Sequence, residues 1–434
     1  MLTIKTDIKN KQWLIYILNE FKHINRAKFQ IEVISITQNT NNTNIIYYTN
    51  NSIANAISIF NSNKPVPSSE IIYLKDNLYI LNNTQTKNFT LNYDLLWNAF
   101  VFLTRYEEYL SEQNGKKIHS YSINHPRLDK TTFKIPIVNI LFNELENFIT
   151  RHFNKLVFDT QQKAVIDLSH DVDYITKTIQ LRLKQTILNS YNTLKYILKP
   201  NLFIEHLKKT IKFTFSNPSY WCFDYWTNLE NKYNYKSTFY IYVKNNTKNF
   251  KTWLIDPSYN IQTNKILQNK LKQLYNNGFQ IGLHGSYSSA TNYTLLKKEK
   301  MILENILNIP ITKTRQHWLN YSETITPNNH SKLFQYDSTL GWNDIIGFRN
   351  GCASCFKPYN FETQKAFAHT EIPQIIMDSN VFDYNNSIKD VYKILNYAKF
   401  IPKTPYFSIS WHQRVNNNDY KWHILYEEIL SEYI

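Results

Sequence analysis

One short segment most constrains how this chain can fold, because it joins a buried strand to a cluster of ionisable groups. The largely apolar run from Val165 to Leu168 leads directly into Ser169-His170-Asp171-Val172-Asp173. Such groups are costly to remove from water unless they are paired or bind a metal. A helix N-cap would need only one of the two carboxylates. In parallel α/β folds, functional sites form where strands end, so the segment predicts a site at a strand terminus.

The elements after residue 161 predict a parallel sheet. Short apolar runs alternate with helical stretches, which is the pattern of βαβ units. About seven such strands favour a (β/α) barrel, closed or nearly closed, over residues 161–434. An open doubly wound sheet is the alternative. The expected strands are Ala164–Ser169, Ser237–Val243, Phe279–Leu283, Thr312–His317, Lys332–Tyr336, Glu371–Met377 and Phe407–Ser410.

Residues 1–160 predict a smaller α/β accessory domain, and a chain of 434 residues is long enough for two domains. β-rich runs occur at Ile31–Ile36 and Asn44–Tyr48, and helical apolar spacing occurs at Leu95–Leu110 and Pro136–Ile149. The region has no cluster of His, Cys and carboxylates at ligand spacing. We therefore interpret it as a structural or substrate-positioning domain.

A basic helical insertion is expected at about residues 174–216. It contains eight Lys or Arg residues and one acid, Glu205, and its apolar residues recur at helical spacing. A basic amphipathic helix can lie on an anionic membrane surface. It can equally present a solvated face while it packs on the barrel, which is the simpler interpretation.

The net charge of +15 reflects either a lysine-rich codon bias or binding to anionic polymers or membranes. No motif of a nucleic-acid-binding module is visible, so nucleic acid is not an expected partner. Nothing indicates an obligate protein partner either.

The first residues of the chain lack the apolar core of a signal peptide, and no apolar run reaches the length of about 18 residues that a membrane span needs. We expect the cytoplasm, or the inner membrane face if the basic insertion contacts lipid. The three cysteines, Cys222, Cys352 and Cys355, are too few for a disulfide framework. The C-x-x-C pair lacks the second pair of a structural zinc site, so we interpret these thiols as incidental.

Three further strand ends carry polar residues that could act with the first segment. His284 follows Ile281–Leu283, Arg315 follows Ile311-Thr-Lys-Thr, and His412 follows Trp411. A histidine at a strand end can bind a metal, and an arginine can orient a carboxylate. His412, in company with the other sites, is a candidate general acid.

Glycine offers an independent sign of specialised backbone. Six of the seven glycines fall within residues 278–351. Gly282 and Gly285 bracket His284, and Gly347 and Gly351 bracket Arg349. In a chain this poor in glycine, these positions indicate positive φ or a close approach of the backbone to another group.

Seven motifs, in order, resemble those of the polysaccharide deacetylases (NodB-like, carbohydrate esterase family 4). The resemblance is strongest to a bacterial subgroup with an S/T-H-D-V-D motif and an extra N-terminal domain, whose L-x-R-Y-E-E-Y-L stretch is matched at Leu103–Leu110. The match covers about residues 161–434. The motifs are Ser169–Asp173, Gly282–Tyr287, Arg315–Trp318, Asp337–Gly341, Gly347–Gly351, Glu371–Asp378 and Trp411-His412.

The resemblance implies that the (β/α) barrel is distorted. It also implies a metal-dependent deacetylase that hydrolyses the acetyl amide of an N-acetylated sugar in a cell-envelope glycan or its precursor. It makes Asp171 the base, His412 the general acid and Arg315 the residue that holds Asp171. Asp173 and His284 become ligands of a divalent metal, with zinc expected and cobalt, nickel or manganese as alternatives. The implied substrate-binding residues are Arg349, Trp411, Tyr287 and Asp378.

Two departures from the family pattern leave the ligand set open. Val172 separates the two aspartates, which are adjacent in the family, and the family's second metal histidine falls at Ser288, whose hydroxyl is a poor zinc ligand. His170, another carboxylate such as Asp378, or water would complete the set. The alternatives are a catalytically silent glycan-binding protein and a hydrolase of a non-sugar amide.

Overall fold

The computed structural model describes residues 1–62, 71–74, 78–81, 88–160, 165–244, 255–384, 386–400 and 406–433. The chain divides into two compact units, each built from two stretches of sequence. Unit 1 comprises Met1–Asp167 and Leu319–Ile409, and unit 2 comprises Leu168–Trp318 and Ser410–Ile434. The domain boundary expected after residue 160 stays a prediction, and the first residues of the expected barrel, including Ala164, lie outside the described part.

The largest sheet has eight strands in the order β14-β11-β10-β9-β8-β7-β16-β15. The pairs β7–β8, β8–β9, β9–β10 and β11–β14 are parallel. The strands are β7 (Val165–Val172), β8 (Thr238–Tyr242), β9 (Gln280–Gly285), β10 (Lys313–Gln316), β11 (Tyr336–Asp337), β14 (Thr370–Glu371), β15 (Gln374–Met377) and β16 (Tyr406–Ser410).

The two ends of this strand order come from one short piece of chain. β14 and β15 are separated only by Ile372 and Pro373, so the sheet must curl to bring its ends near each other. Proline cannot donate to a strand ladder, which explains why the single strand expected over Glu371–Met377 is two. The curled parallel sheet forms a half-barrel, and the predicted α/β fold with a distorted barrel is confirmed.

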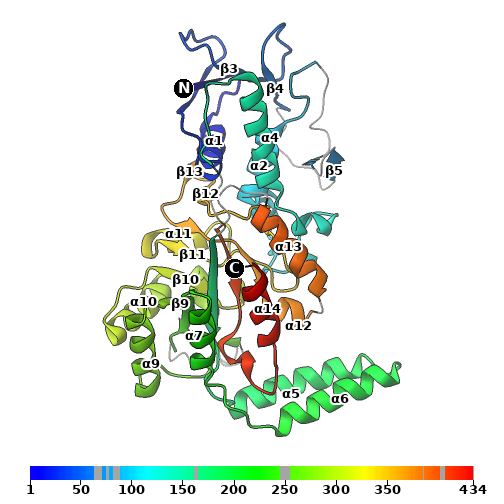
Figure 1. Cartoon of the computed structure of the whole chain (residues 1–434), viewed down its shortest axis with the longest axis vertical. Coiled ribbons are helices and arrows are strands. Elements are labelled where there is room, and N and C mark those ends of the chain that lie inside the picture. Colours follow the sequence, from blue (N-terminus) through cyan, green and yellow to red (C-terminus); the bar gives the residue numbers. More distant parts are fainter. Residues whose placement is uncertain are drawn as a thin grey trace. The chain divides into compact units, whose positions relative to one another are not determined.

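Helices connect the successive parallel strands of unit 2, as parallel pairing requires. α7 precedes β8, α9 precedes β9 and α10 precedes β10 (Figure 1). The expected insertion is a pair of helices, α5 and α6, which lie side by side in Figure 1. The helices are α5 (Ile179–Leu194), α6 (Pro200–Phe215), α7 (Phe223–Lys232), α9 (Lys265–Asn276), α10 (Tyr293–Leu307) and α14 (His423–Tyr433), with short 3-10 turns at η4 (Tyr287–Thr291) and η6 (Gln413–Asn416).

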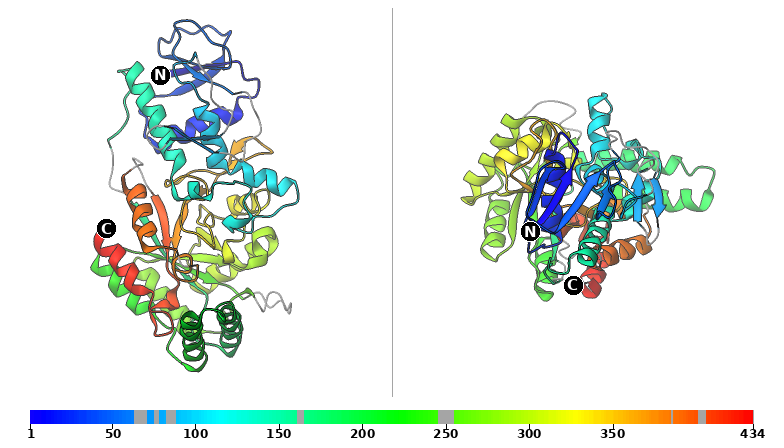
Figure 2. Two further views of the ribbon diagram at one scale, coloured as in Figure 1. Left: turned by 90° about the vertical axis from the view of Figure 1, so that its right-hand side faces the viewer. Right: turned by 90° about the horizontal axis from the view of Figure 1, so that it is seen from above.

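Unit 1 contains a second, smaller parallel sheet, in the order β2-β1-β3-β4 (Figure 2). Apolar faces of α1, α2 and α4 bury the core of the unit beside this sheet. Its elements are β1 (Leu2–Thr6), β2 (Ile31–Ser35), β3 (Ile45–Thr49), β4 (Ser58–Phe60), β5 (Ile71–Leu74), β6 (Leu78–Leu81), β12 (Tyr359–Asn360), β13 (Lys365–Ala366), α1 (Gln12–Ile24), α2 (Leu95–Thr104), α3 (Tyr106–Gln113), α4 (Ile137–His152), α11 (Thr326–Leu333), α12 (Asp378–Phe382), α13 (Ile388–Phe400), η2 (Ser122–Asn124) and η3 (Lys130–Lys134).

Two local expectations were wrong. The strand expected at Lys332–Tyr336 is replaced by the end of α11 and by β11, which begins only at Tyr336. The single helix expected over Leu95–Leu110 is broken at Arg105, whose φ of 54° is left-handed. A buried ion pair holds this residue, because the Arg105 Nη2 lies 2.7 Å from the Glu323 Oε2.

The tight backbone expected at several glycines is confirmed. A Cβ on Gly282 would lie 2.7 Å from the ring of Tyr240, and one on Gly285 would lie 2.5 Å from the side chain of Gln316. Gly347 has a φ of +142°, and its Cβ would lie 2.2 Å from a backbone oxygen. These contacts leave no room for a side chain at the three positions.

Three buried arginine–glutamate pairs stabilise unit 1. Besides Arg105–Glu323, they are Arg127–Glu107 and Arg349–Glu108. The Arg349 Nη2 lies 2.6 Å from the Glu108 Oε2, and both side chains are almost fully buried. The Leu103–Leu110 stretch thus contributes one member to each pair.

Arg349→Ala is expected to destabilise unit 1 by about 3–5 kcal/mol, because it leaves the buried carboxylate of Glu108 without its partner. Urea unfolding followed by tryptophan fluorescence measures the loss. The matched control is Arg26→Ala, which removes a pair with Asp159 whose side chains are 25% and 33% exposed. It is expected to cost less than about 1 kcal/mol, and equal losses would contradict the structural role of the Arg349 pair.

Candidate active site

Two aspartates near the end of β7 share one side of the sheet. Side chains alternate along a strand, so Asp171 and Asp173, two residues apart, point the same way. Val172 between them points to the other side and is fully buried in the core. The departure from adjacent aspartates therefore keeps both carboxylates on one face.

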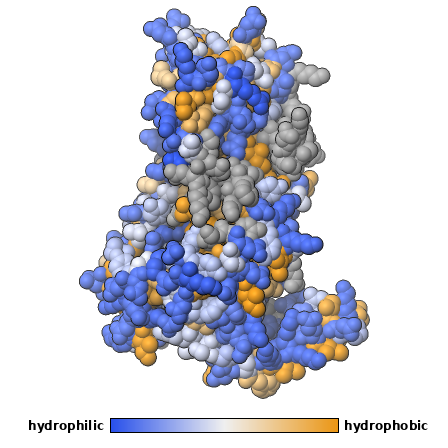
Figure 3. Space-filling model, in the orientation of Figure 1, coloured by the Kyte–Doolittle hydropathy of each residue, from blue (hydrophilic) through white to orange (hydrophobic). Residues whose placement is uncertain are grey.

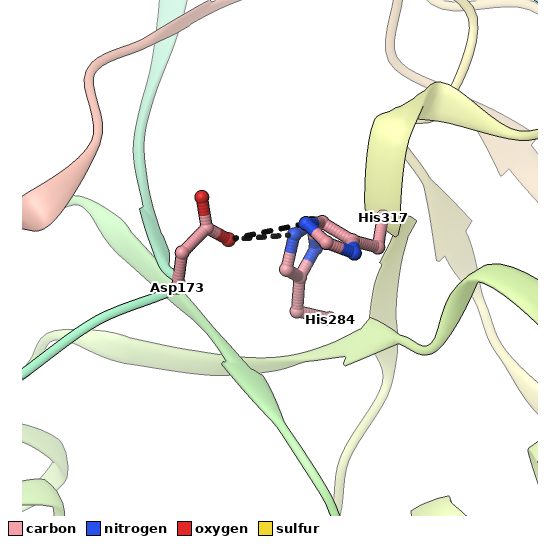
Figure 4. Close-up of side chains that lie close together, drawn as sticks. All are labelled: Asp173, His284 and His317. Carbon is pink, nitrogen blue, oxygen red and sulfur yellow. Dashed lines mark ion pairs between the residues drawn. The ribbon is translucent and has the colours of Figure 1, made fainter. Parts of the chain in front are cut away.

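Two imidazole rings face the second of these carboxylates (Figure 4). The Asp173 Oδ1 lies 3.4 Å from the His284 Nε2 and 3.7 Å from the His317 Nε2. All three side chains are buried, and their ligand atoms lie within 4.8 Å of one another. Three atoms that prefer a divalent cation thus converge on one point.

Hydrogen bonds on the far side of each ring fix this arrangement. The His284 Nδ1 donates to the backbone oxygen of Arg315 at 3.0 Å, and the His317 Nδ1 lies 3.2 Å from the Asp256 Oδ1. Both Nε2 atoms are left directed at Asp173, as in protein metal sites where a second residue orients each histidine. The Asp173 Oδ1 is buried and accepts no hydrogen bond from the described residues. The donor set fits a divalent ion such as zinc.

His317 takes the place of the second metal histidine, which is absent at position 288. Ser288 is exposed in the η4 turn, whereas His317 directly follows β10 and lies two residues after Arg315. Alternation along the strand places Arg315 and His317 on the same side. This spacing was a signal in the sequence that pointed to His317, although Arg315 was the only residue of that motif expected to act in the site.

His170 is removed from the ligand set, because both of its ring nitrogens are already used. The Nε2 lies 2.8 Å from the Glu230 Oε1, and the Nδ1 lies 2.8 Å from the backbone oxygen of Trp411. As the neighbour of Asp171 on the strand, His170 points to the opposite face of the sheet. There it contributes to the packing of the core.

Arg315 holds Asp171. Its Nη1 donates to the Asp171 Oδ1 at 2.7 Å and to the Ser410 Oγ at 2.9 Å. The guanidinium lies 4.4 Å from the ring centre of Tyr240, which occupies the space that the absent side chain of Gly282 leaves. Burial raises the pKa of Asp171, but the charge of Arg315 and nearby histidines lowers the pKa further, so that it lies below its usual value.

Two basic side chains from the segment after β16 lie against the other oxygen of Asp173. The His412 Nε2 lies 3.2 Å from the Asp173 Oδ2, and the Arg414 Nη1 lies 2.9 Å from the same atom. Burial raises the pKa of Asp173, but His412, His284 and Arg414 outweigh it, so the pKa lies well below its usual range. Asp173 therefore stays ionised.

The residues expected to bind substrate are found in both units. In unit 2, the indole of Trp411 is fully buried and donates to the backbone oxygen of Trp422 at 2.9 Å, while Tyr287 is half-buried. In unit 1, Arg349 pairs with Glu108, and Asp378 is buried at the start of α12. Their assignment to substrate binding stays a prediction.

A second group of ligand atoms lies in unit 1, formed by Asp337, His369 and Glu371. Both oxygens of Asp337 already accept hydrogen bonds, from Thr339 and His330, and the Glu371 Oε1 accepts one from the backbone of Leu340. The ring nitrogens of His369 have no hydrogen-bond partner among the described residues. No described residue orients the ring of His369, and both oxygens of Asp337 already accept hydrogen bonds. This group therefore fits a metal less well than Asp173, His284 and His317.

Comparisons with known proteins give two further findings. A family of unknown function, DUF7033, matches residues 2–154, which is less than half of the chain. No curated protein matches the chain.

Among solved structures, a "putative polysaccharide deacetylase" from Mycobacterium smegmatis is similar over 63% of this chain and 84% of its own, with 13% identity and a TM-score of 0.37. Another so described, involved in O-antigen biosynthesis in Bordetella bronchiseptica, has 12% identity, coverages of 62% and 80%, and a TM-score of 0.28. A polysaccharide deacetylase from Bacillus cereus has 11% identity, coverages of 62% and 88%, and a TM-score of 0.28. At these TM-scores, we base the functional proposal on the side chains of the site.

We expect the protein to bind one divalent metal ion and His317→Ala to weaken binding at least tenfold, because it removes one of three ligands. Asp256→Ala should weaken binding by about 10–100-fold through the loss of ring orientation. Isothermal titration with zinc measures both effects. Ser288→Ala and His369→Ala are the matched controls and should bind as the parent does. If His369→Ala lost the metal instead, the ion would belong to the group in unit 1.

Proposed function

We propose that this chain is a metal-dependent deacetylase that removes the acetyl group from an N-acetylated sugar of a cell-envelope glycan or its precursor. One observation carries the proposal: two carboxylates on one face of a strand have separate partners. Asp171 is paired with Arg315, while the Asp173 Oδ1 accepts no hydrogen bond from the described residues and faces two imidazole nitrogens. One carboxylate is thus suited to proton transfer and the other to holding a cation.

Asp171 is suited to act as the general base. Arg315 keeps it ionised and fixes its orientation, so that it accepts a proton from a water molecule. The water oxygen forms a bond to the acetyl carbon, and the carbon–nitrogen bond breaks. His412, whose side chain is 13% exposed beside Asp173, supplies the proton that the leaving nitrogen needs. The products are acetate and a free amine.

Asp173, His284 and His317 would hold the metal ion. A divalent ion bound there supplies Lewis-acid chemistry, since it polarises the acetyl carbonyl and lowers the pKa of water. Because His317 stands in for the histidine absent at position 288, the ligand set is not reduced. This favours an enzyme over the catalytically silent alternative.

An exposed aromatic ring beside the site supports a sugar substrate. Trp318 is 48% exposed, and its ring centre lies 6.0 Å from that of His317. Aromatic faces pack against apolar faces of ligands while their edges stay wet. A pyranose ring offers such a face, which a small linear amide does not.

Acetate release from N-acetylglucosamine oligomers in the presence of zinc, cobalt, nickel or manganese tests the proposal. Asp171→Asn should lower kcat by about 10²–10⁴-fold while zinc binding is retained. The matched control is Asp224→Asn, which changes a carboxylate in the same unit whose side chain is 70% exposed, and it should leave kcat unchanged. The proposal fails if no N-acetyl sugar is hydrolysed with any of the four metals. Hydrolysis of other amides alone would point to a non-sugar substrate.

The pH profile tests the role of Arg315 separately. The general base works when deprotonated, and Arg315 lowers the pKa of Asp171, so activity should persist at low pH until Asp171 is protonated. Arg315→Gln removes the charge and raises that pKa, and the acid limb of kcat/KM should move to higher pH. Arg315→Lys keeps the charge and should move the limb less. An unshifted limb in Arg315→Gln would exclude Asp171 as the base.

A further inference from the structure

The helical hairpin α5–α6 has an unusual distribution of polar and apolar side chains. In a water-soluble hairpin, apolar residues meet between the helices and polar residues face out. Here hydroxyl groups meet between the helices: Thr186 and Thr214 lie 2.9 Å apart, and Thr193 and Thr210 lie 3.2 Å apart. Polar groups therefore contact one another between the helices, in addition to the buried apolar residues Leu181 and Phe213.

Ten exposed apolar residues of the hairpin form one stripe along each helix on its outer surface. Residues three or four positions apart share a helix face, and the spacing of the two sets follows this rule. Their exposed fractions range from 39% for Leu207 to 92% for Leu198. The stripes consist of Ile179, Leu183, Ile187, Tyr191, Leu194 and Leu198 on α5 and the turn after it, and of Ile204, Leu207, Ile211 and Phe215 on α6.

Both stripes lie on the same side of the hairpin. In each helix the stripe is turned by roughly 90° from the inner face, in the same sense, at 3.6 residues per turn. The short connection makes the two helices antiparallel, and equal turns in antiparallel neighbours place the stripes on one side. Each helix has 16 residues, so the apolar surface is about 24 Å long at 1.5 Å per residue. Figure 3 shows apolar residues exposed along the hairpin beside polar ones.

The charge of the hairpin is positive at the edges of this surface. Of the eight cations between residues 174 and 216, Lys177 and Arg182 bind groups at the base of the hairpin. Lys209 pairs with Glu205, the one acid of the segment. Among the described residues, no ion pair is formed by Lys199, Lys208 or Lys212. An apolar stripe flanked by lysines is complementary to a bilayer surface with anionic headgroups.

We propose that α5–α6 docks the protein on an anionic membrane surface, with the apolar stripes in the headgroup region and the lysines against lipid phosphates. A second copy of the chain is a poorer occupant, because docking two such faces brings like charges together. No helix among the described residues has the length and apolar character to cross a bilayer. The hairpin lies on the membrane surface in this arrangement.

The hairpin is clamped to the loop that carries two residues of the candidate site. Lys177 and Asp419 form a buried pair at 2.8 Å, and Asp419 also accepts from Tyr220. Asp419 follows His412 and Arg414 in the same loop. A cavity of about 240 Å³ lies at the base of α5. The residues that line it include Thr178 and Tyr174, which is the residue after Asp173. Docking would thus hold the candidate site close to the lipid surface.

This position has a consequence for the substrate, which, unlike the docking itself, rests on the proposed function. A site held at the membrane favours an N-acetylated sugar carried on a lipid over a free sugar. The binding of the hairpin to lipid and the chemistry of the site are separate properties. They can be tested separately.

Sedimentation with vesicles tests the docking. The full chain should bind vesicles of phosphatidylcholine mixed with phosphatidylglycerol, and bind phosphatidylcholine alone at least tenfold more weakly. Lys199→Gln, Lys208→Gln and Lys212→Gln together should weaken binding by about 100-fold at low salt, at about fivefold per lysine. The matched control replaces three exposed lysines elsewhere in unit 2, Lys272, Lys297 and Lys298, by Gln.

The apolar stripes need their own variants. Ile187→Gln, Leu194→Gln and Ile211→Gln together should weaken binding at least tenfold and leave the helical circular dichroism unchanged, since glutamine forms helices well. The control changes Ile266, Met301 and Ile424, which are 73%, 49% and 55% exposed in the same unit, to Gln. The control should bind as the parent does.

Three outcomes would overturn the docking: no binding to anionic vesicles, equal losses in the hairpin and control variants, or a concentration-dependent dimer that the stripe variant abolishes. The last would make a second copy the occupant. For the substrate, the stripe variant should lose acetate release from an N-acetylated glycolipid in vesicles at least tenfold and keep it on soluble oligomers. Equal rates on both would overturn the lipid-linked substrate, whereas no release from either would count against the proposed function alone.

Discussion

Two carboxylates buried on one face of β7 are the constraint on which unit 2 depends. A buried carboxylate must be compensated by cations or hydrogen bonds, and Asp171 and Asp173 draw their partners from several elements. Arg315 comes from β10, His284 from β9, and Arg414 from the loop after β16. Since these elements meet only in the parallel sheet, the same charges that require compensation also hold the strand ends in place.

Unit 1 uses the same interaction for a structural purpose. The Leu103–Leu110 stretch places Arg105, Glu107 and Glu108 in buried pairs with partners far away in the sequence or in a nearby loop. In each of these pairs the carboxylate of a glutamate has an arginine as its partner. The site differs in one respect: among the described residues no group donates a hydrogen bond to the Asp173 Oδ1, which faces two ring nitrogens instead. This arrangement distinguishes the candidate metal centre from the arginine–glutamate pairs of unit 1.

The hairpin α5–α6 adds a second contrast within unit 2. At the core of the unit, polar groups are buried only with partners, and apolar residues fill the rest. In the hairpin, threonine hydroxyls pair between the helices and isoleucine and leucine side chains face out. Apolar surface exposed in a regular stripe signals an interaction partner. The hairpin and the candidate site share one anchor in the loop that contains His412, Arg414 and Asp419.

The separate roles of Asp171 and Asp173 come from the family resemblance and stay predictions. Local patterns were enough to predict the strands β7 to β10 and the strand-end position of the candidate site. These features depend on apolar runs and on the two-residue repeat of a strand, which are present in the sequence itself. The identity of the second histidine beside Asp173 was not predictable in this way. It depends on which side chain of the neighbouring strands faces Asp173. It also depends on acceptors elsewhere in the chain, since Glu230 accepts from His170 and Asp256 orients His317. The break at Arg105 and the turn between β14 and β15 likewise depend on partners distant in the chain. Arg105 needs Glu323 to compensate its buried charge. β14 and β15 pair with strands at opposite ends of the sheet.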